Sequence, residues 1–131
     1  MSAFVAEEIP ASVVAFMANF HSSLSEYDLL AFNQAEVSIL KIIAEKLKIP
    51  YEKISLNLSK YGDTCGNSIP LLLTDLYGGH GQKELRVLAC GFGEGLSWGV
   101  ADFVIDAKDI LEVIETDEVF GDGSVSHVFQ Q

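Results

Sequence analysis

Short, continuously apolar runs alternate with longer segments of helical periodicity along this chain, and this alternation limits the possible folds more than any other feature. Residues 29–32 (LLAF), 54–58 (ISLNL) and 85–91 (LRVLACG) have the length and composition of buried strands. The segments between them repeat apolar residues at three- and four-residue spacings, as one face of a helix does. The sequence therefore predicts an α/β fold with helices packed on a mixed sheet.

Proline, serine and glycine residues predict where the helices begin and end. Pro10 is tolerated only in the first turn of a helix, so the first helix is expected to begin near this residue. Ser68 is expected to cap the third helix, and Gly78-Gly79 to end it. The expected order is helix 5–20, strand 29–32, helix 34–49, strand 54–58, helix 68–77, strand 85–91 and strand 96–105.

Charge excludes one class of partner and disfavours another. The 131 residues include 19 acids and eight lysines and arginines, for a net charge of −11. Nucleic acid needs clustered basic residues, and those of this chain are scattered. The same charge disfavours docking of another acidic protein, such as an acyl carrier protein, unless a local basic patch forms.

Localisation is predicted from two absences in the sequence. No apolar run is long enough to span a bilayer. The N-terminus has no basic segment and carries Glu7 and Glu8 where a signal peptide would be apolar. We expect a soluble cytoplasmic protein without membrane contact.

Cysteine and histidine spacing predicts no metal and no cofactor. Cys65 and Cys90 lie 25 positions apart without a CxxC motif, and the three histidines have no ligand spacing. A disulfide is not required of a cytoplasmic chain.

Three features follow expected strands and are candidates for one site. Asn33 follows the first strand, Asp63 lies in the turn YGDTCGNS, and the GFGEG turn (91–95) follows the strand at 85–91. Ligand sites in such sheets form where strands run into loops at their carboxyl ends. Residues 106–131 hold seven acids and one lysine. We expect them to be an acidic extension of a domain at 1–105. It is either a short helix with a strand-like end, an arm against a partner, or a frayed terminus.

Three motifs in one order carry a family resemblance. LLAFNQAEVSILKIIAEKLKIP, NLSKYGDTCGNSIPLLL and LRVLACGFGEGLSWGVADF together resemble the C-terminal half of beta-ketoacyl-acyl-carrier-protein synthase III, a thiolase-superfamily transferase of fatty acid biosynthesis. The likeness runs from about residue 3 to residue 105. It implies a thiolase-like half-fold with a sheet of about five strands, and a catalytic cysteine in the N-terminal half, which this chain lacks. Neither Cys65 nor Cys90 matches that nucleophile.

The resemblance also assigns the candidate catalytic positions. The family's His-Gln-Ala-Asn segment corresponds to residues 33–36, so its histidine is matched by Asn33, which donates a hydrogen bond but takes up no proton near neutral pH. The asparagine of the family's Tyr-Gly-Asn-Thr loop is matched by Asp63, which only accepts and would repel a developing enolate. The family's carrier-protein arginine is matched by Ser38. These replacements predict a degenerate site.

The last motif retains its backbone. The family's turn lends an oxyanion-hole N–H from the position of Glu94, and Gly93 and Gly95 would form the turn beside the substrate. The alternative is that the glycines only permit a sharp bend. Trp98 and Phe92 are expected in the core rather than as a ligand platform.

These observations support three hypotheses. The first is a non-catalytic half-domain, a structural or partner subunit that forms a homodimer or binds a separate N-terminal-half protein. The alternative is a fragment of a condensing enzyme or acyltransferase whose cysteine lies outside these residues. The third is binding of an acyl-CoA or acyl-thioester ligand without chemistry, disfavoured if Glu36 and Asp102 also face the site.

Overall fold

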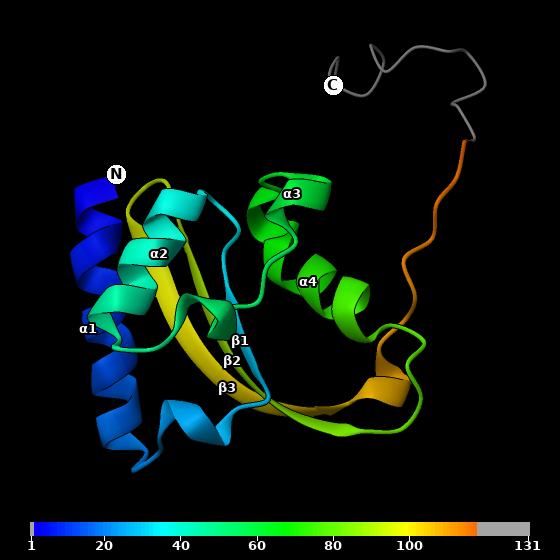
Figure 1. The fold of residues 1–131 in the computed structure, drawn as a ribbon, viewed down its shortest axis with the longest axis horizontal. Coiled ribbons are helices and arrows are strands. Elements are labelled where there is room, and N and C mark those ends of the chain that lie inside the picture. The colour runs from blue at the N-terminus through cyan, green and yellow to red at the C-terminus, as the bar shows by residue number, and fades with distance from the viewer. Residues whose placement is uncertain (1, 118–131) are drawn as a thin grey trace.

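The computed structural model describes residues 2–117 (Figure 1). No helix in this part of the chain is both long and apolar enough to cross a membrane. The elements are α1 (Ser2–Asn19), β1 (Leu29–Phe32), α2 (Val37–Lys46), α3 (Leu58–Tyr61), α4 (Ser68–Tyr77), β2 (Glu84–Gly93) and β3 (Ser97–Asp106), with 3₁₀ turns at Leu24–Glu26, Tyr51–Lys53, Cys65–Asn67 and Ala107–Asp109.

The sheet is mixed and has the order β1-β2-β3. β1 runs parallel to β2, with Leu29 opposite Val87, and β3 runs antiparallel to β2. A single parallel bridge between Leu30 and Ile54 extends the sheet beyond β1. The α/β class predicted from the sequence is confirmed, although the described residues form three strands rather than about five.

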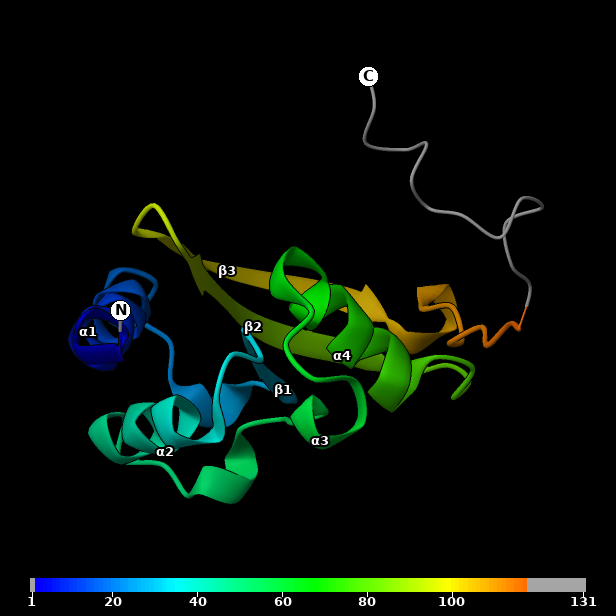
Figure 2. The same cartoon turned by 90° about the horizontal axis from the view of Figure 1, so that it is seen from above.

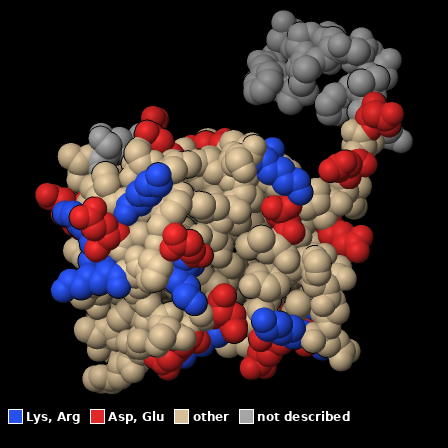
Figure 3. Space-filling model, viewed as in Figure 1, with Lys and Arg blue, Asp and Glu red and all other residues tan. Residues whose placement is uncertain are grey.

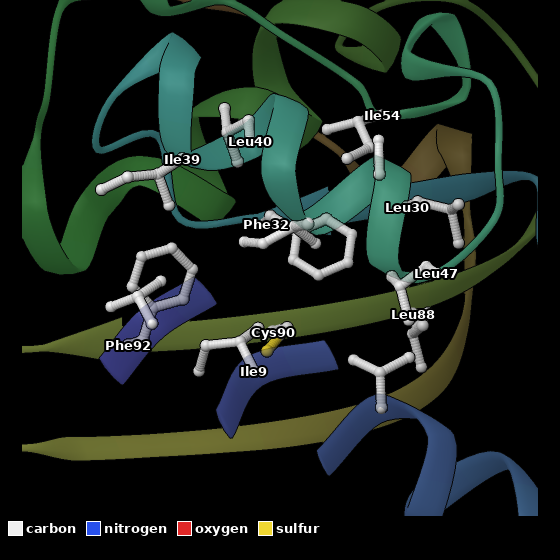
Figure 4. Close-up of a cluster of buried hydrophobic side chains, with 14 of the residues drawn as sticks. Ile9, Leu30, Phe32, Ile39, Leu40, Leu47, Ile54, Leu88, Cys90 and Phe92 are labelled. Carbon is white, nitrogen blue, oxygen red and sulfur yellow. The ribbon is translucent and has the colours of Figure 1, made fainter. Parts of the chain in front are cut away.

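Helices cover both faces of the sheet (Figure 2). α1 and α2 bury the even-numbered side chains of β1 and β2, and Figure 4 shows Phe32 beneath α2 and Cys90 beside Ile9 of α1. α4 covers the odd-numbered side chains, among them Leu29 and Val87. Because both faces of β1 are covered, all four of its residues are buried.

The first helix begins earlier than expected. It starts at Ser2, and Pro10 lies inside it. Proline removes the hydrogen bond that a residue at this position would donate to the Ala6 carbonyl. Val5 and Ile9 are almost fully buried one turn apart, so packing of the early turns onto the sheet compensates for the missing bond.

The second helix begins later than expected, and the strand at 54–58 does not form. α2 starts at Val37 rather than at residue 34, because Gln34 is fully buried with its side chain bonded across to the next segment. Only Ile54 of the expected strand pairs with β1. At the third helix, the cap residue is Asn67 rather than Ser68, and its side chain makes no capping hydrogen bond.

Candidate functional site

A cavity of about 900 Å³ opens where the end of β1, the β2–β3 turn and the loop before α4 meet. The first residues of α1 lie at the same end of the molecule as the β2–β3 turn (Figure 1). The cavity therefore gathers the three segments that the sequence predicted to converge, although the loop before α4 follows α3 rather than a strand. The side chains with polar or aromatic groups at its wall include Asn33, Glu36, Asp63, Cys65, Glu94 and Trp98.

Asn33 is positioned by the sheet itself. Its backbone N–H donates to the Cys90 carbonyl at 3.0 Å, which extends the β1–β2 pairing by one residue. The side chain is partly exposed at the cavity and makes no hydrogen bond within residues 2–117. Its amide is consequently free to donate to, or accept from, a ligand.

Asp63 is held by its own turn. Its Oδ1 accepts a hydrogen bond from the Cys65 backbone N–H at 2.8 Å. Cys65 has a φ of 51°, a left-handed conformation that is uncommon for a residue with a Cβ. The turn presents the exposed Cys65 side chain to the same cavity as Asp63.

The β2–β3 turn supplies the opposite wall. Gly93 and Ser97 form the last pair of the ladder, and the chain reverses through Gly95 and Leu96 with φ values of 84° and 40°. Gly93 and Glu94 line the cavity, whereas Gly95 is not among its lining residues. The N–H of Glu94 lies beyond the last ladder pair, so β2–β3 pairing does not use it.

Glycines form the floor of the cavity. Gly91 lies opposite Gly99 across the β2–β3 ladder, and both line the cavity together with Gly93. A Cβ added at any of the three would meet no heavy atom within 4 Å. These glycines leave bare backbone beneath open space. The sequence indicated a bend here but not the pairing of Gly91 with Gly99 on the cavity floor, which depends on the strand register.

Trp98 and Phe92 differ in burial. Phe92 is in the core, as expected, with 9% of its surface exposed. Trp98 is 42% exposed and lines the cavity, so the prediction of a core tryptophan is wrong. Its indole N–H donates to Ser12 Oγ at 2.8 Å, and its ring meets the edge of Phe4 with centroids 4.8 Å apart. The ring is thereby fixed on α1 rather than covered by the core.

Carboxylates dominate the charge at the cavity. Glu36, Asp63 and Glu94 line it, and no Lys, Arg or His does so in the described part of the chain. Of the two further acids considered from the sequence, Glu36 lines the cavity and Asp102 does not, because the Asp102 carboxylate bonds to Tyr27 and Arg86. On the face drawn in Figure 3, basic side chains are dispersed among acidic ones. Residues 2–117 contain no cluster of His, Cys, Asp and Glu able to hold a metal ion.

The second cysteine lies in the core. Cys90 is 1% exposed, and its side chain packs on the α1 and α2 face of the sheet. Burial raises the pKa of this thiol to about 12. Because the thiolate is the nucleophilic form, this burial and raised pKa disfavour reaction of Cys90 at neutral pH.

Comparison with known proteins identifies the family of this chain. Residues 17–105 match the family described as 3-Oxoacyl-[acyl-carrier-protein (ACP)] synthase III C terminal. The chain belongs to this family. Its resemblance to the C-terminal half of the synthase, predicted from three motifs, is confirmed.

Relatives of this synthase III domain are named as the synthase and are longer than the matched region. The chain is 39% identical over 99 residues to the beta-ketoacyl-[acyl-carrier-protein] synthase III of Prochlorococcus marinus (strain MIT 9215). The aligned residues make up 75% of this chain and 30% of that protein. The synthase III of Synechococcus sp. (strain RCC307) is 36% identical over 99 residues, which again make up 75% of this chain and 30% of that protein. The chain thus spans about a third of the length of the curated relatives it matches.

Solved synthase structures share the fold. The crystal structure of a 3-oxoacyl-(acyl-carrier protein) synthase from Burkholderia xenovorans LB400 superposes with a TM-score of 0.81 at 32% identity, covering 88% of this chain and 34% of that one. The synthase III of Pseudomonas aeruginosa PAO1 gives a TM-score of 0.66 at 25% identity, covering 88% and 35%. The cavity of this synthase III domain therefore lies within a fold that these enzymes share.

Proposed function

We propose that this chain is a non-catalytic half-domain of the synthase III fold that acts as a structural or partner subunit. One observation carries the proposal: Asn33 lies at the cavity in the position of the family's histidine, and no His, Lys or Arg lines the cavity in the described part of the chain. A general base has to take up a proton near the working pH, which the Asn33 amide cannot do.

The charge of the cavity supports the same conclusion. An oxyanion or enolate is stabilised by hydrogen-bond donors aimed at it. Asp63 presents a carboxylate that already accepts from the Cys65 N–H, and Glu36 and Glu94 add two further acids. Three carboxylates around one cavity oppose a developing negative charge. They also oppose binding of a phosphorylated CoA tail, which disfavours an acyl-CoA ligand.

Helix α4 supports a role as a partner. Its sequence, SIPLLLTDLY, is apolar almost all round, a composition typical of a helix buried on every side. Only Ser68 and Leu72 are buried in the described structure, and Leu76 is 37% exposed. A second protein that covers α4 would remove this apolar surface from water. A homodimer and a complex with a separate N-terminal-half protein both meet this requirement.

A second candidate function rests on the comparisons. Relatives named as synthase III are about three times as long as the matched region. The chain can accordingly be a fragment of a condensing enzyme or acyltransferase whose nucleophilic cysteine lies in another segment. In that case the cavity would complete an acyl-transfer site only beside that segment.

Incubation with acyl-CoA tests the proposal. The full chain is mixed with acetyl-CoA or a longer acyl-CoA, and intact mass and released CoA are followed. We expect no acyl adduct and no CoA release above the rate of a Cys65→Ser variant, with the Prochlorococcus synthase as the positive control. Thiol-dependent release that the Cys65→Ser change abolishes would overturn the non-catalytic assignment.

Sedimentation tests the partner role separately. We expect the chain to self-associate at micromolar concentration, or to associate with a protein that carries the N-terminal half of the synthase fold. Leu76→Lys places a charge on the exposed side of α4 and should weaken either association. A stable monomer that also does not bind the protein with the N-terminal half of the synthase fold would contradict the proposal.

A further inference from the structure

β3 forms one border of the sheet. Within residues 2–117 it pairs with β2 alone, and in Figure 2 it lies along the outer side of the ribbon, away from β1. It is ten residues long, and most of its side chains are exposed or partly exposed. Its second edge is therefore a long row of backbone groups without a neighbouring strand.

The hydrogen bonds of β2 show which backbone groups of β3 lie on this outer edge. The Arg86 carbonyl accepts from Asp28 N–H at 2.9 Å, on the β1 side of β2. The Cys90 carbonyl accepts from Asn33 N–H at 3.0 Å on the same side. Even-numbered residues of β2 thus direct their backbone groups toward β1, and odd-numbered residues direct theirs toward β3.

The register transfers this alternation to β3. Val87 pairs with Phe103 and Ala89 pairs with Ala101, so odd-numbered residues of β3 exchange hydrogen bonds with β2. Even-numbered residues direct N–H and C=O groups away from the sheet. These outward-facing residues are Trp98, Val100, Asp102 and Val104.

This edge carries little of the usual protection against strand pairing. Its ten residues include no proline and no lysine. The register runs without a bulge from Glu84 opposite Asp106 to Gly93 opposite Ser97. The one charge in the middle of the strand, Asp102, is tied to Arg86 at 3.0 Å. Within residues 2–117, the backbone of the edge is accordingly open to an added strand.

A groove accompanies the edge on the α1 side. It has a volume of about 350 Å³ and lies between α1 and the first half of β3. Apolar surface from Ala15, Phe16 and Val100 meets polar groups of Ser12 and Asn19 there. An added strand places alternate side chains over this groove, which is the arrangement that gives strand addition its specificity.

The acidic residues around the outer edge of β3 indicate which kind of segment would bind there. Glu8 lies one helical turn before Ser12, on the same side of α1, and Glu26 bonds to Arg86 beside Asp102. A second copy would bring the same acids and a further charge of −11. Electrostatic complementarity favours a segment that carries lysine or arginine instead.

We propose that the outer edge of β3 binds an extended segment of a different polypeptide, which adds a strand to the sheet. Its apolar side chains lie over the α1 groove, and its lysines or arginines lie near Glu8 and Glu26. This binding surface shares Trp98 and Gly99 with the wall of the cavity, but strand addition uses the backbone of β3 and does not depend on whether the cavity has lost its chemistry.

Hydrogen exchange of the full chain tests the proposal. The probe is a synthetic ten-residue peptide of alternating threonine and valine with lysine at each end. At a peptide concentration of about ten times Kd, exchange at the N–H groups of residues 98, 100, 102 and 104 should slow by about tenfold. The N–H groups of Ala101 and Phe103 already bond to β2 and serve as an internal control. Emission of Trp98, the single tryptophan, should shift to the blue as the strand covers it.

Two variants and two peptides make the test specific. Val104→Pro removes an outward N–H without touching the β2 ladder, so it should fold but bind the peptide about tenfold more weakly. Val104→Thr keeps the N–H and should bind as the parent chain does. A peptide methylated at alternate backbone nitrogens cannot complete the ladder, and a glutamate-flanked peptide lacks the complementary charge; both should bind more weakly.

Several results would overturn the proposal. Protection of residues 98–104 in the free chain at every concentration would mean that the chain covers this edge itself. Protection that grows with protein concentration would assign the edge to a second copy. Equal binding of the methylated peptide would exclude strand pairing, and equal binding of the glutamate-flanked peptide would exclude the basic occupant.

Discussion

The Gln34 side chain accepts a hydrogen bond from the Asn57 backbone N–H at 3.1 Å. Its amide nitrogen donates to the Ser55 carbonyl at 3.1 Å and to the Phe32 carbonyl at 3.0 Å. One buried side chain thus bonds to the backbone at residues 55 and 57, where the pairing of a neighbouring strand would otherwise be expected. This explains why the apolar run at 54–58 pairs with β1 only through Ile54.

Replacement of Gln34 should destabilise the fold strongly. Gln34→Leu keeps the volume but leaves the Asn57 N–H and the Ser55 carbonyl without partners, at a cost of about 3 kcal/mol in the free energy of unfolding. Urea denaturation measures the loss. Gln82→Leu, at an exposed glutamine, is the matched control and should change stability by less than about 0.5 kcal/mol. Equal unfolding midpoints for the two variants would contradict this account.

Sequence periodicity predicted the elements whose burial is local. The bounds of β1 and α4 agree with the prediction, because LLAF is buried on both faces and Gly78 ends the helix. Three predictions were wrong for a common reason: the start of α1, the start of α2 and the strand at 54–58. Each depends on contacts between distant segments, namely the packing of Ile9 before Pro10, the bonds of Gln34 and the single bridge at Ile54. Tertiary contacts of this kind override local propensity.

The site was predictable in outline for a similar reason. Asn33 and Glu94 follow the ends of the neighbouring strands β1 and β2, so these two could be grouped from the sequence. Asp63 joins them at the cavity although the strand expected before it does not form. The exposure of Trp98 and the floor at Gly91 and Gly99 depend on the register of β2 against β3. No sequence pattern specified that register.

A polar cluster clamps the segment before β1 to the sheet. The Tyr27 hydroxyl donates to Asp102, whose carboxylate also meets Arg86, and the guanidinium lies 4.7 Å from the Tyr27 ring centre. The Tyr27 hydrogen bond is the main cause that lowers the pKa of Asp102, with Arg86 adding to it. Desolvation and the Asp102 bond raise the pKa of Tyr27.

The clamp should therefore weaken at both ends of the pH scale. Asp102 contributes stability above its unfolded pKa of about 3.8, and this is lost as pH falls through its lowered folded pKa. Tyr27 contributes stability below about pH 10, and this is lost as pH rises through its raised folded pKa. Tyr27→Phe should cost about 1 kcal/mol at pH 7 and reduce the loss at both ends. Urea denaturation at pH 3, 7 and 10.5 measures this.

Tyr51→Phe serves as the control for the clamp. The Tyr51 hydroxyl makes no hydrogen bond in the described part of the chain, so its removal should leave the pH profile unchanged. If both tyrosine variants follow the parent profile, Tyr27 has no part in the pH dependence.

The two thiols should react at very different rates. Cys65 is exposed, whereas Cys90 is buried with its pKa raised to about 12. An aromatic disulfide reagent at pH 8 should label one thiol per chain quickly and the second only after denaturation. Cys65→Ser should remove the fast phase. Two fast equivalents in the native chain would show that the core around Cys90 opens readily.

Two glycine substitutions should differ in their effect on stability. At Gly91 an added methyl group enters open space on the cavity floor, so Gly91→Ala should leave stability unchanged or raise it by about 0.4 to 1 kcal/mol through the unfolded state. At Gly78 the same methyl group would lie 2.5 Å from the Thr74 carbonyl oxygen and would also clash with the Leu111 backbone. Gly78→Ala should therefore cost about 1 to 3 kcal/mol. Thermal unfolding of both variants measures the contrast, and a loss at Gly91 as large as that at Gly78 would mean that the cavity floor is covered in solution.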